Sequence, residues 1–428
     1  MRHLWLILGA LICAAGIWLY AQRVMIPYQM VQAAAQDRPR GNLSDLYPRW
    51  VGTRELLLHG RDPYSAEVAR EIQAGYYGRP LDSSRAGDPK DQQGFAYPVY
   101  VVFALAPTLR LPFANVQRWF FCLLILLTAA SALIWLQALH ERNSFTVQSV
   151  VVVMTLGSLP AMQGLKLQQM SLLVAGLVAI AVWLLIHDHQ LAAGVVLALA
   201  TMKPQLVLLL VVWLAIWTLA DLRRRYRWAA AFLVVMAIQI GAAEWHLPHW
   251  IPRFWQAVLD YRRYTGAISV LEESVGSWAG RVVEVLAFLL LMQFCWRERS
   301  RAANTIAFAQ MTSMVLAFTV LLIPADSVYN QILLIPALLV LVENCRAMWR
   351  RNVPSRVLLL AAGAMVVWPW ISSVALAALS FFWPEETIGR AWAVPFWTSL
   401  LIPVGVAALM LVNAEQRSFG ELAEGSTS

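Results

Sequence analysis

Apolar runs long enough to cross a bilayer as a helix, about 20 residues, recur along the whole chain, with short arginine-bearing loops between them. This pattern predicts an all-α, polytopic transmembrane protein that forms one integral membrane domain over residues 1–428. We expect twelve spans, near residues 4–20, 116–139, 146–163, 168–187, 190–203, 204–220, 228–245, 278–296, 304–323, 329–349, 356–380 and 392–412.

Two segments decide the direction of every later span. Residues 97–113 are apolar but contain three prolines and Arg110, so a re-entrant or interfacial segment fits them better than a span. Residues 190–220 fit two short helices that break at Met202-Lys203-Pro204, at membrane depth. If residues 97–113 do not cross the membrane and residues 190–220 cross it twice, the arginine clusters at 221–227, 296–301 and 346–356 fall on the cytoplasmic side, as the positive-inside rule requires.

The polar segments follow from the same assignment. The apolar run from Leu4 to Tyr20 predicts an uncleaved anchor rather than a signal peptide, because its small residues lie inside the run. Residues 21–115 then form a first extracytoplasmic loop, in which residues 46–59 predict a helix along the membrane interface. Residues 246–277 form a second large outer loop, and residues 413–428 a polar cytoplasmic tail.

Composition narrows the function classes. The chain is 60% hydrophobic and 14% charged, with a net charge of +8 carried almost wholly by arginine. The arginines are dispersed along the chain rather than gathered on one soluble face, so nucleic-acid binding is not supported. All four cysteines lie in apolar runs, and no cysteine and histidine spacing indicates zinc. We therefore expect no metal and no other cofactor.

The unusual polar residues converge on the outer side of this topology. Lys203 lies between apolar runs, where an unpaired charge costs about 2.5–3.5 kcal/mol on insertion scales. It either binds an anion such as a lipid phosphate or extends to the interface, as buried lysines often do. Asp45 precedes the interfacial helix; it fits an N-cap, a proton acceptor for an incoming hydroxyl, or both. Other candidates for the proton acceptor, which charge alone does not rank, are Asp37, Asp62, Asp82, Asp88 and Asp91.

Other polar residues on that side leave two interpretations open. Gln163, Gln169, Tyr329 and Asn330 either contact sugar hydroxyls or satisfy helix ends. Asp326 belongs to the same outer group. The loop at 246–277 is either an aromatic belt at the interface or a phosphate and sugar contact surface that includes Arg262 and Arg263.

Four sequence blocks form a recognisable pattern: the run from Asp45 through Tyr64, with Phe95-Ala-Tyr-Pro98 after it; Gln169-Met-Ser-Leu-Leu; Ala193-Gly194 through Lys203-Pro204; and Tyr329-Asn330-x-Ile-Leu-Leu-Ile-Pro336. In this order they resemble the integral-membrane glycosyltransferases of family 87, in the GT-C superfamily, which include polyprenol-phosphate-mannose-dependent mannosyltransferases. Gln168 stands where that family usually has glycine, and Asn330 stands where it usually has aspartate.

The resemblance implies a reaction and a set of roles. It implies an inverting transfer of a sugar, mannose or another hexose or pentose, from a polyprenyl-phosphate donor to a lipid or glycan hydroxyl on the extracytoplasmic side of the cell membrane. Asp45 matches the proposed general base, and Lys203, Arg262 and Arg263 are placed to bind the donor phosphate electrostatically. The candidate substrate-binding residues are Gln163, Gln169, Tyr329, Asn330 and Tyr97.

Two other functions fit parts of the pattern. A transporter or lipid flippase would explain a helix broken at Lys203-Pro204, although the chain shows no repeat partner for this break and the large first loop has no role in a transporter. A catalytically inert subunit that positions partners would leave product formation unchanged when Asp45 or Lys203 is replaced.

Overall fold

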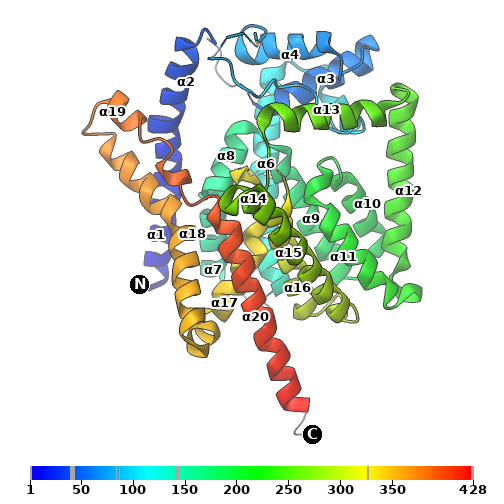
Figure 1. Ribbon diagram of the computed structural model, residues 1–428, viewed down its shortest axis with the longest axis vertical. Coiled ribbons are helices and arrows are strands. Elements are labelled where there is room, and N and C mark those ends of the chain that lie inside the picture. The colour runs from blue at the N-terminus through cyan, green and yellow to red at the C-terminus, as the bar shows by residue number, and fades with distance from the viewer. Residues whose placement is uncertain are drawn as a thin grey trace.

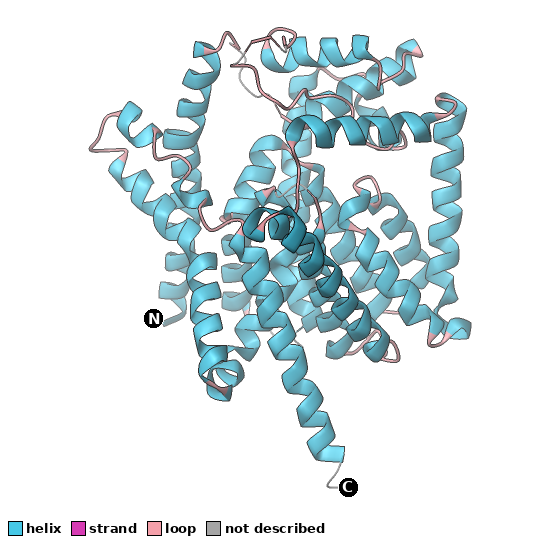
Figure 2. Ribbon diagram, in the orientation of Figure 1, coloured by secondary structure: helices cyan, strands magenta, loops and turns pink. Residues whose placement is uncertain are grey.

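The computed structural model describes residues 2–38, 44–82, 84–85, 87–139, 144–324 and 327–425, and these residues form helices and loops without a strand (Figures 1 and 2). Asp326, one of the predicted polar residues, lies outside the described residues. The first half contains α1 (Arg2–Tyr20), η1 (Ala21–Met25), α2 (Ile26–Ala35), α3 (Leu46–His59), α4 (Ala66–Tyr77), α5 (Val101–Leu105), η2 (Ala106–Thr108), α6 (Phe113–Leu139), α7 (Phe145–Leu156), α8 (Leu159–Leu167), α9 (Met170–Ile186) and α10 (Gln190–Ala200).

The second half begins at the predicted break. It contains η3 (Pro204–Leu206), α11 (Leu208–Leu219), α12 (Leu222–His246), α13 (Trp250–Thr265), α14 (Val270–Val275), α15 (Ser277–Glu298), α16 (Ile306–Leu322), η4 (Val328–Leu334), α17 (Ile335–Arg351), α18 (Val353–Leu379), α19 (Glu385–Gly389), η5 (Val394–Phe396) and α20 (Leu401–Gly425). The all-α prediction is therefore confirmed.

Seven helical segments of the described chain are long and apolar enough to cross a membrane, or eight if the bent pair α7 and α8 is one span. The predicted count of twelve is not confirmed. Four segments counted as spans are the shorter apolar helices α9, α10, α11 and α16, of 17, 11, 12 and 17 residues. At 1.5 Å per residue, none of them reaches across a hydrocarbon core of about 30 Å when straight.

The two decisive segments are both interrupted in the structure. Residues 97–113 form only α5 and the 3-10 turn η2, and the long helix α6 begins at Phe113, directly after the last proline. The segment 190–220 is interrupted after Ala200, with a turn over Thr201–Lys203 and a new start at Pro204. Both interruptions coincide with prolines, which cannot donate the helical hydrogen bond.

The limits of two predicted segments differ from the structure. The first helix does not end at Tyr20 but continues through the π-helical turn η1 into α2, because Ala21, Val24 and Met25 are buried in a second apolar cluster with Ile388. The first polar loop therefore begins about 15 residues later than predicted, after Ala35. At the other end, α20 continues to Gly425, through most of the predicted tail.

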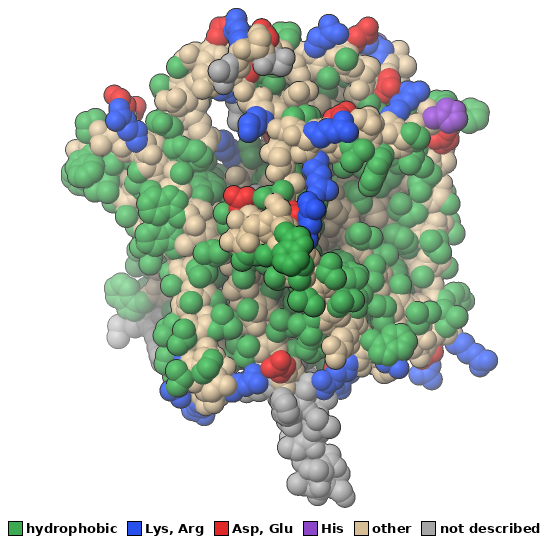
Figure 3. All heavy atoms as spheres, viewed as in Figure 1, with side chains coloured by type: hydrophobic (Ala, Val, Ile, Leu, Met, Phe, Trp, Pro, Cys, Tyr) green, Lys and Arg blue, Asp and Glu red, His purple; other side chains and the backbone are tan. Residues whose placement is uncertain are grey.

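The packing places polar elements at the two ends of a helical bundle. Helices α9 and α16 are apolar on all sides and form its interior, as helices without a polar face do. Helices α3, α4 and α13 lie across one end, whereas the turns α11–α12, α15–α16 and α17–α18 lie at the other end (Figure 1). These three turns carry the three arginine clusters, so we call this end of the bundle the arginine end. Two of the turns are in contact, because the Nη1 atom of Arg225 donates to the carbonyl of Arg299 at 2.7 Å. An apolar belt separates the arginine end from the opposite end (Figure 3).

Candidate active site

A cavity of about 410 Å³ is lined by α3, by the loop over residues 91–98, by α13 and by the interrupted ends of bundle helices. Seven of the nine predicted site residues line it, although they come from six separate parts of the chain: Asp45, Tyr97, Gln169, Lys203, Arg262, Tyr329 and Asn330. Apolar side chains complete the wall: Leu208, Phe254, Trp255, Val258 and Ile323. The cavity therefore has a polar side and an apolar side.

The Asp45 carboxylate is held by two neutral donors. Its Oδ1 atom accepts a hydrogen bond from the hydroxyl of Tyr76 at 3.1 Å, and its Oδ2 atom accepts one from the side-chain amide of Gln169. Asp45 does stand at the N-cap position of α3, but its side chain makes no capping hydrogen bond. The cap interpretation of this side chain is therefore wrong, and the carboxylate is free to face the cavity.

The turn between α8 and α9 delivers Gln169 to this carboxylate. Gln168 adopts a left-handed conformation with φ of 51°, which is the reason glycine suits this position. Its side-chain amide donates to the carbonyl of Gln117, away from the cavity. Gln169 then begins α9 without capping it, so its amide is available to Asp45. The glutamine that stands at position 168 in place of glycine therefore affects the turn and leaves the cavity wall intact.

Lys203 is buried at the helix break, with 7% of its surface exposed. Its Nζ atom donates to Ser171 Oγ at 2.6 Å and to Asn330 Oδ1 at 3.3 Å, and lies 4.8 Å from the centre of the Tyr329 ring. The ammonium is therefore held by contacts inside the protein. No carboxylate within the described part of the chain forms an ion pair with it. The cavity wall therefore carries a cation whose charge these contacts do not neutralise.

Two predicted residues have other roles. The Oε1 atom of Gln163 accepts the backbone N–H of Tyr329 at 3.1 Å, so Gln163 holds η4 in place instead of lining the cavity. Arg263 is exposed on α13 and pairs with Asp260 at 3.3 Å, so it does not line the cavity either. Arg262 does line the cavity, but from an exposed position at its rim.

Sequence reasoning missed three residues of this site and named a fourth, Asp91, only among the alternatives to Asp45. Arg49 lies one turn after Asp45 on α3 and lines the cavity, and its helical spacing could have indicated this. Tyr76 and Ser171 hold Asp45 and Lys203 through contacts between distant segments, which no local pattern reveals. Asp91 also lines the cavity; burial raises the pKa of its carboxyl, whose oxygens accept hydrogen bonds from the backbone and the side chain of Gln93.

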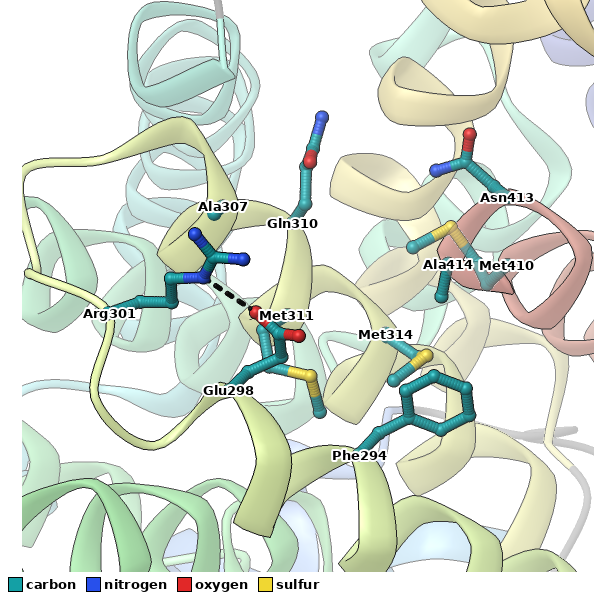
Figure 4. Close-up of a pocket in the computed structure, with 10 residues that line it drawn as sticks. All are labelled: Phe294, Glu298, Arg301, Ala307, Gln310, Met311, Met314, Met410, Asn413 and Ala414. Atoms are coloured by element: carbon teal, nitrogen blue, oxygen red, sulfur yellow. Dashed lines mark hydrogen bonds and ion pairs between the residues drawn. The ribbon is translucent and has the colours of Figure 1, made fainter. Parts of the chain in front are cut away.

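No three histidine, cysteine, aspartate or glutamate side chains within the described ranges come together as a metal site. That the protein works without a metal stays a prediction. A second, smaller cavity of about 70 Å³ lies at the arginine end, beside the ion pair of Glu298 with Arg301 (Figure 4). Three methionines and the side chain of Gln310 line it, and it contains none of the predicted site residues.

The arrangement can perform three chemical tasks in one place. A carboxylate without a cationic partner can accept a proton. A buried cation without a carboxylate partner can bind an anion. The apolar wall, where Trp255 and Leu208 are largely exposed, can accommodate a hydrocarbon chain.

No curated protein and no solved structure matches the chain significantly. The model of glycosyltransferase family 87 matches residues 95–324, more than half of the chain. The match includes Tyr97, Gln169, Lys203 and Arg262, whereas Asp45 precedes it and Tyr329 and Asn330 follow it; folding brings all of them to the same cavity. By this match the chain is a glycosyltransferase with membrane-spanning helices, and it belongs to glycosyltransferase family 87.

Proposed function

We propose that this protein transfers a sugar, mannose or another hexose or pentose, from a polyprenyl-phosphate donor to a hydroxyl of a lipid or glycan acceptor. One observation carries the proposal: a single cavity joins the Asp45 carboxylate, the buried Lys203 ammonium and an apolar wall. A lipid-linked sugar phosphate needs these three features together, because its chain is apolar, its phosphate is anionic and its acceptor must lose a proton.

In the proposed reaction, Asp45 accepts the proton of the acceptor hydroxyl as that oxygen attacks the anomeric carbon. The bond between this carbon and the phosphate oxygen breaks, and its electron pair stays on the oxygen of the leaving polyprenyl phosphate. Lys203 stabilises the charge that develops there. Tyr76 and Gln169 hold the carboxylate in one orientation. A single displacement without a covalent intermediate inverts the anomeric centre.

The proposed side of the membrane follows from charge. Residues of α3 and α13 line the cavity, and these helices lie at the end of the bundle opposite the three arginine-bearing turns (Figure 1). Because short loops rich in arginine stay in the cytoplasm, we place the cavity on the extracytoplasmic side of the cell membrane. Donor and acceptor would then meet at the outer surface, and the polyprenyl chain would stay in the bilayer.

Replacing Asp45 by asparagine tests the proposal. Asp45→Asn keeps the size of the side chain but removes the proton acceptor, so transfer from a radiolabelled polyprenyl-phosphate sugar should fall by about 10²–10⁴-fold. Donor binding and thermal unfolding should change little. Asp260→Asn, which removes a half-exposed carboxylate on α13, is the matched control. An Asp45→Asn enzyme as active as the control would exclude Asp45 as the base.

A further inference from the structure

We propose that Arg49 is a second ligand of the donor phosphate, and that Arg49 and Lys203 form a two-cation site that prefers a dianionic phosphate. This inference rests on the proposed function, because it concerns how the same cavity treats its leaving group. Arg49 lines the cavity together with Asp45 and Lys203. It does not belong to the sequence motif that carries Lys203.

The contacts of Arg49 leave part of its guanidinium unused. Its Nη1 atom donates to the backbone carbonyl of Asp45, and its Cζ atom lies 4.3 Å from the centre of the Tyr97 ring. Its Nε atom is buried and has no acceptor within the described residues. A guanidinium has five N–H donors in a planar fork that matches a phosphate. Arg49 therefore has donors and charge available for a ligand of the cavity.

Arg49 and Lys203 share an unusual environment. Each cation lies against a tyrosine ring of the cavity wall, Tyr97 for Arg49 and Tyr329 for Lys203. Neither forms an ion pair with a carboxylate of the described chain, and Asp45 offers Arg49 only its backbone carbonyl. Arg49 is half-buried and Lys203 is buried, and both line the same cavity as the carboxyl groups of Asp45 and Asp91 and the exposed Arg262. The three cations outnumber the two carboxyl groups, so an anionic ligand would balance the remaining positive charge. The occupant that fits is a phosphate between the two.

The charge count favours the leaving group over the donor. A polyprenyl-phosphate sugar is a phosphodiester with one negative charge. When the bond to the anomeric carbon breaks, the phosphate keeps the electron pair and becomes a monoester, whose second pKa is near 6 and which is therefore mostly dianionic at neutral pH. Two cations match the product rather than the substrate, so they stabilise the charge that develops in the transition state. Arg262 contributes less, because water screens a cation at the exposed rim.

The test compares two ligands that differ by one charge. We would measure dissociation constants of the purified protein in detergent, at pH 7, for farnesyl phosphate and for its methyl diester, by tryptophan fluorescence or calorimetry. The unsubstituted protein should bind the monoester at least tenfold more tightly than the diester. Arg49→Gln should weaken monoester binding at least tenfold and diester binding less than threefold. Arg54→Gln, on the same helix but outside the cavity, is the matched control and should leave both constants within twofold.

Each outcome has one meaning. A folded Arg49→Gln protein whose constants equal those of Arg54→Gln, while transfer is slower, would show that Arg49 acts only through Asp45 and would overturn the proposal. Arg49→Lys keeps the charge and should keep the monoester preference, so its loss in a folded protein would also overturn the proposal. If the unsubstituted protein binds neither ester, the proposed function itself is wrong. Thermal unfolding is measured for every variant.

Discussion

Replacing Asn330 by aspartate should weaken phosphate binding by about ten- to a hundredfold. The Oδ1 atom of Asn330 already lies 3.3 Å from the Lys203 ammonium and accepts the hydroxyl of Ser171 at 2.8 Å. Aspartate has the same shape, so it keeps both contacts and adds a negative charge. Two unit charges about 4 Å apart interact by about 4 kcal/mol at an effective dielectric constant of about 20. Burying the new carboxylate offsets part of this energy.

We take the net attraction between the new carboxylate and Lys203 as about 1.4–2.8 kcal/mol. A phosphate must overcome this attraction to bind Lys203, and each 1.4 kcal/mol raises the dissociation constant tenfold. The assay is the dissociation constant of farnesyl phosphate for the purified protein. Gln205→Glu is the matched control, because it adds the same charge to the exposed wall of the cavity without a contact to Lys203. Equal losses in the two variants would show that Asn330 has no special relation to Lys203. Unchanged or tighter binding in Asn330→Asp would refute the claim that Lys203 binds the phosphate.

Three further predictions concern the frame of the site. Tyr76→Phe removes one hydrogen bond to the proposed base, Asp45, which is worth about 1.5–3 kcal/mol for a charged partner. We expect kcat to fall at least tenfold, while the dissociation constant of the donor stays within twofold. An unchanged kcat would contradict the positioning role of Tyr76. Gly75→Ala would place a Cβ 1.8 Å from the hydroxyl of Tyr47 and should lower the free energy of unfolding by about 1–3 kcal/mol. The Cβ of Gly241→Ala meets nothing within 4 Å, so this variant should raise the free energy of unfolding by up to about 1 kcal/mol. The unfolding temperatures should therefore shift in opposite directions, and equal shifts would refute the packing argument. The pKa of Asp91 is raised in the folded protein, so stability is lost as the pH rises from the unfolded pKa, about 3.9, through the folded pKa. Asp91→Asn should therefore raise the unfolding temperature at pH 8 and not at pH 4. A gain that does not depend on pH would exclude the buried carboxyl as its cause.

The local features of the fold could be predicted because they depend on neighbouring residues. Hydropathy located the helices, and prolines located the interruptions at 97–113 and at Lys203-Pro204. The helix predicted over residues 46–59 has these bounds in the structure. The extension of the first helix to Ala35 was missed, because its residues are buried by packing against Ile388, far along the chain.

The site was predicted only as far as its charges stand out from their surroundings. Lys203 is conspicuous in an apolar run, and Asp45 precedes a helix. Neither position reveals its partners, because Ser171 and Tyr76 reach them through contacts between distant segments. Arg263 was predicted as equivalent to Arg262, but successive residues on a helix point in different directions. The structure accordingly places only Arg262 at the cavity.

The cavity is built where the helices of the bundle are interrupted. Gln169 follows the left-handed turn between α8 and α9, Lys203 lies in the break between α10 and η3, and Asn330 lies in the 3-10 segment η4. An interrupted helix exposes backbone groups that lipid cannot satisfy, so interruptions at membrane depth are stable only where protein or a water-filled cavity meets them. The polar side chains at these three points line one cavity. In this bundle, the helix interruptions that cost stability are also what bring Gln169, Lys203 and Asn330 together.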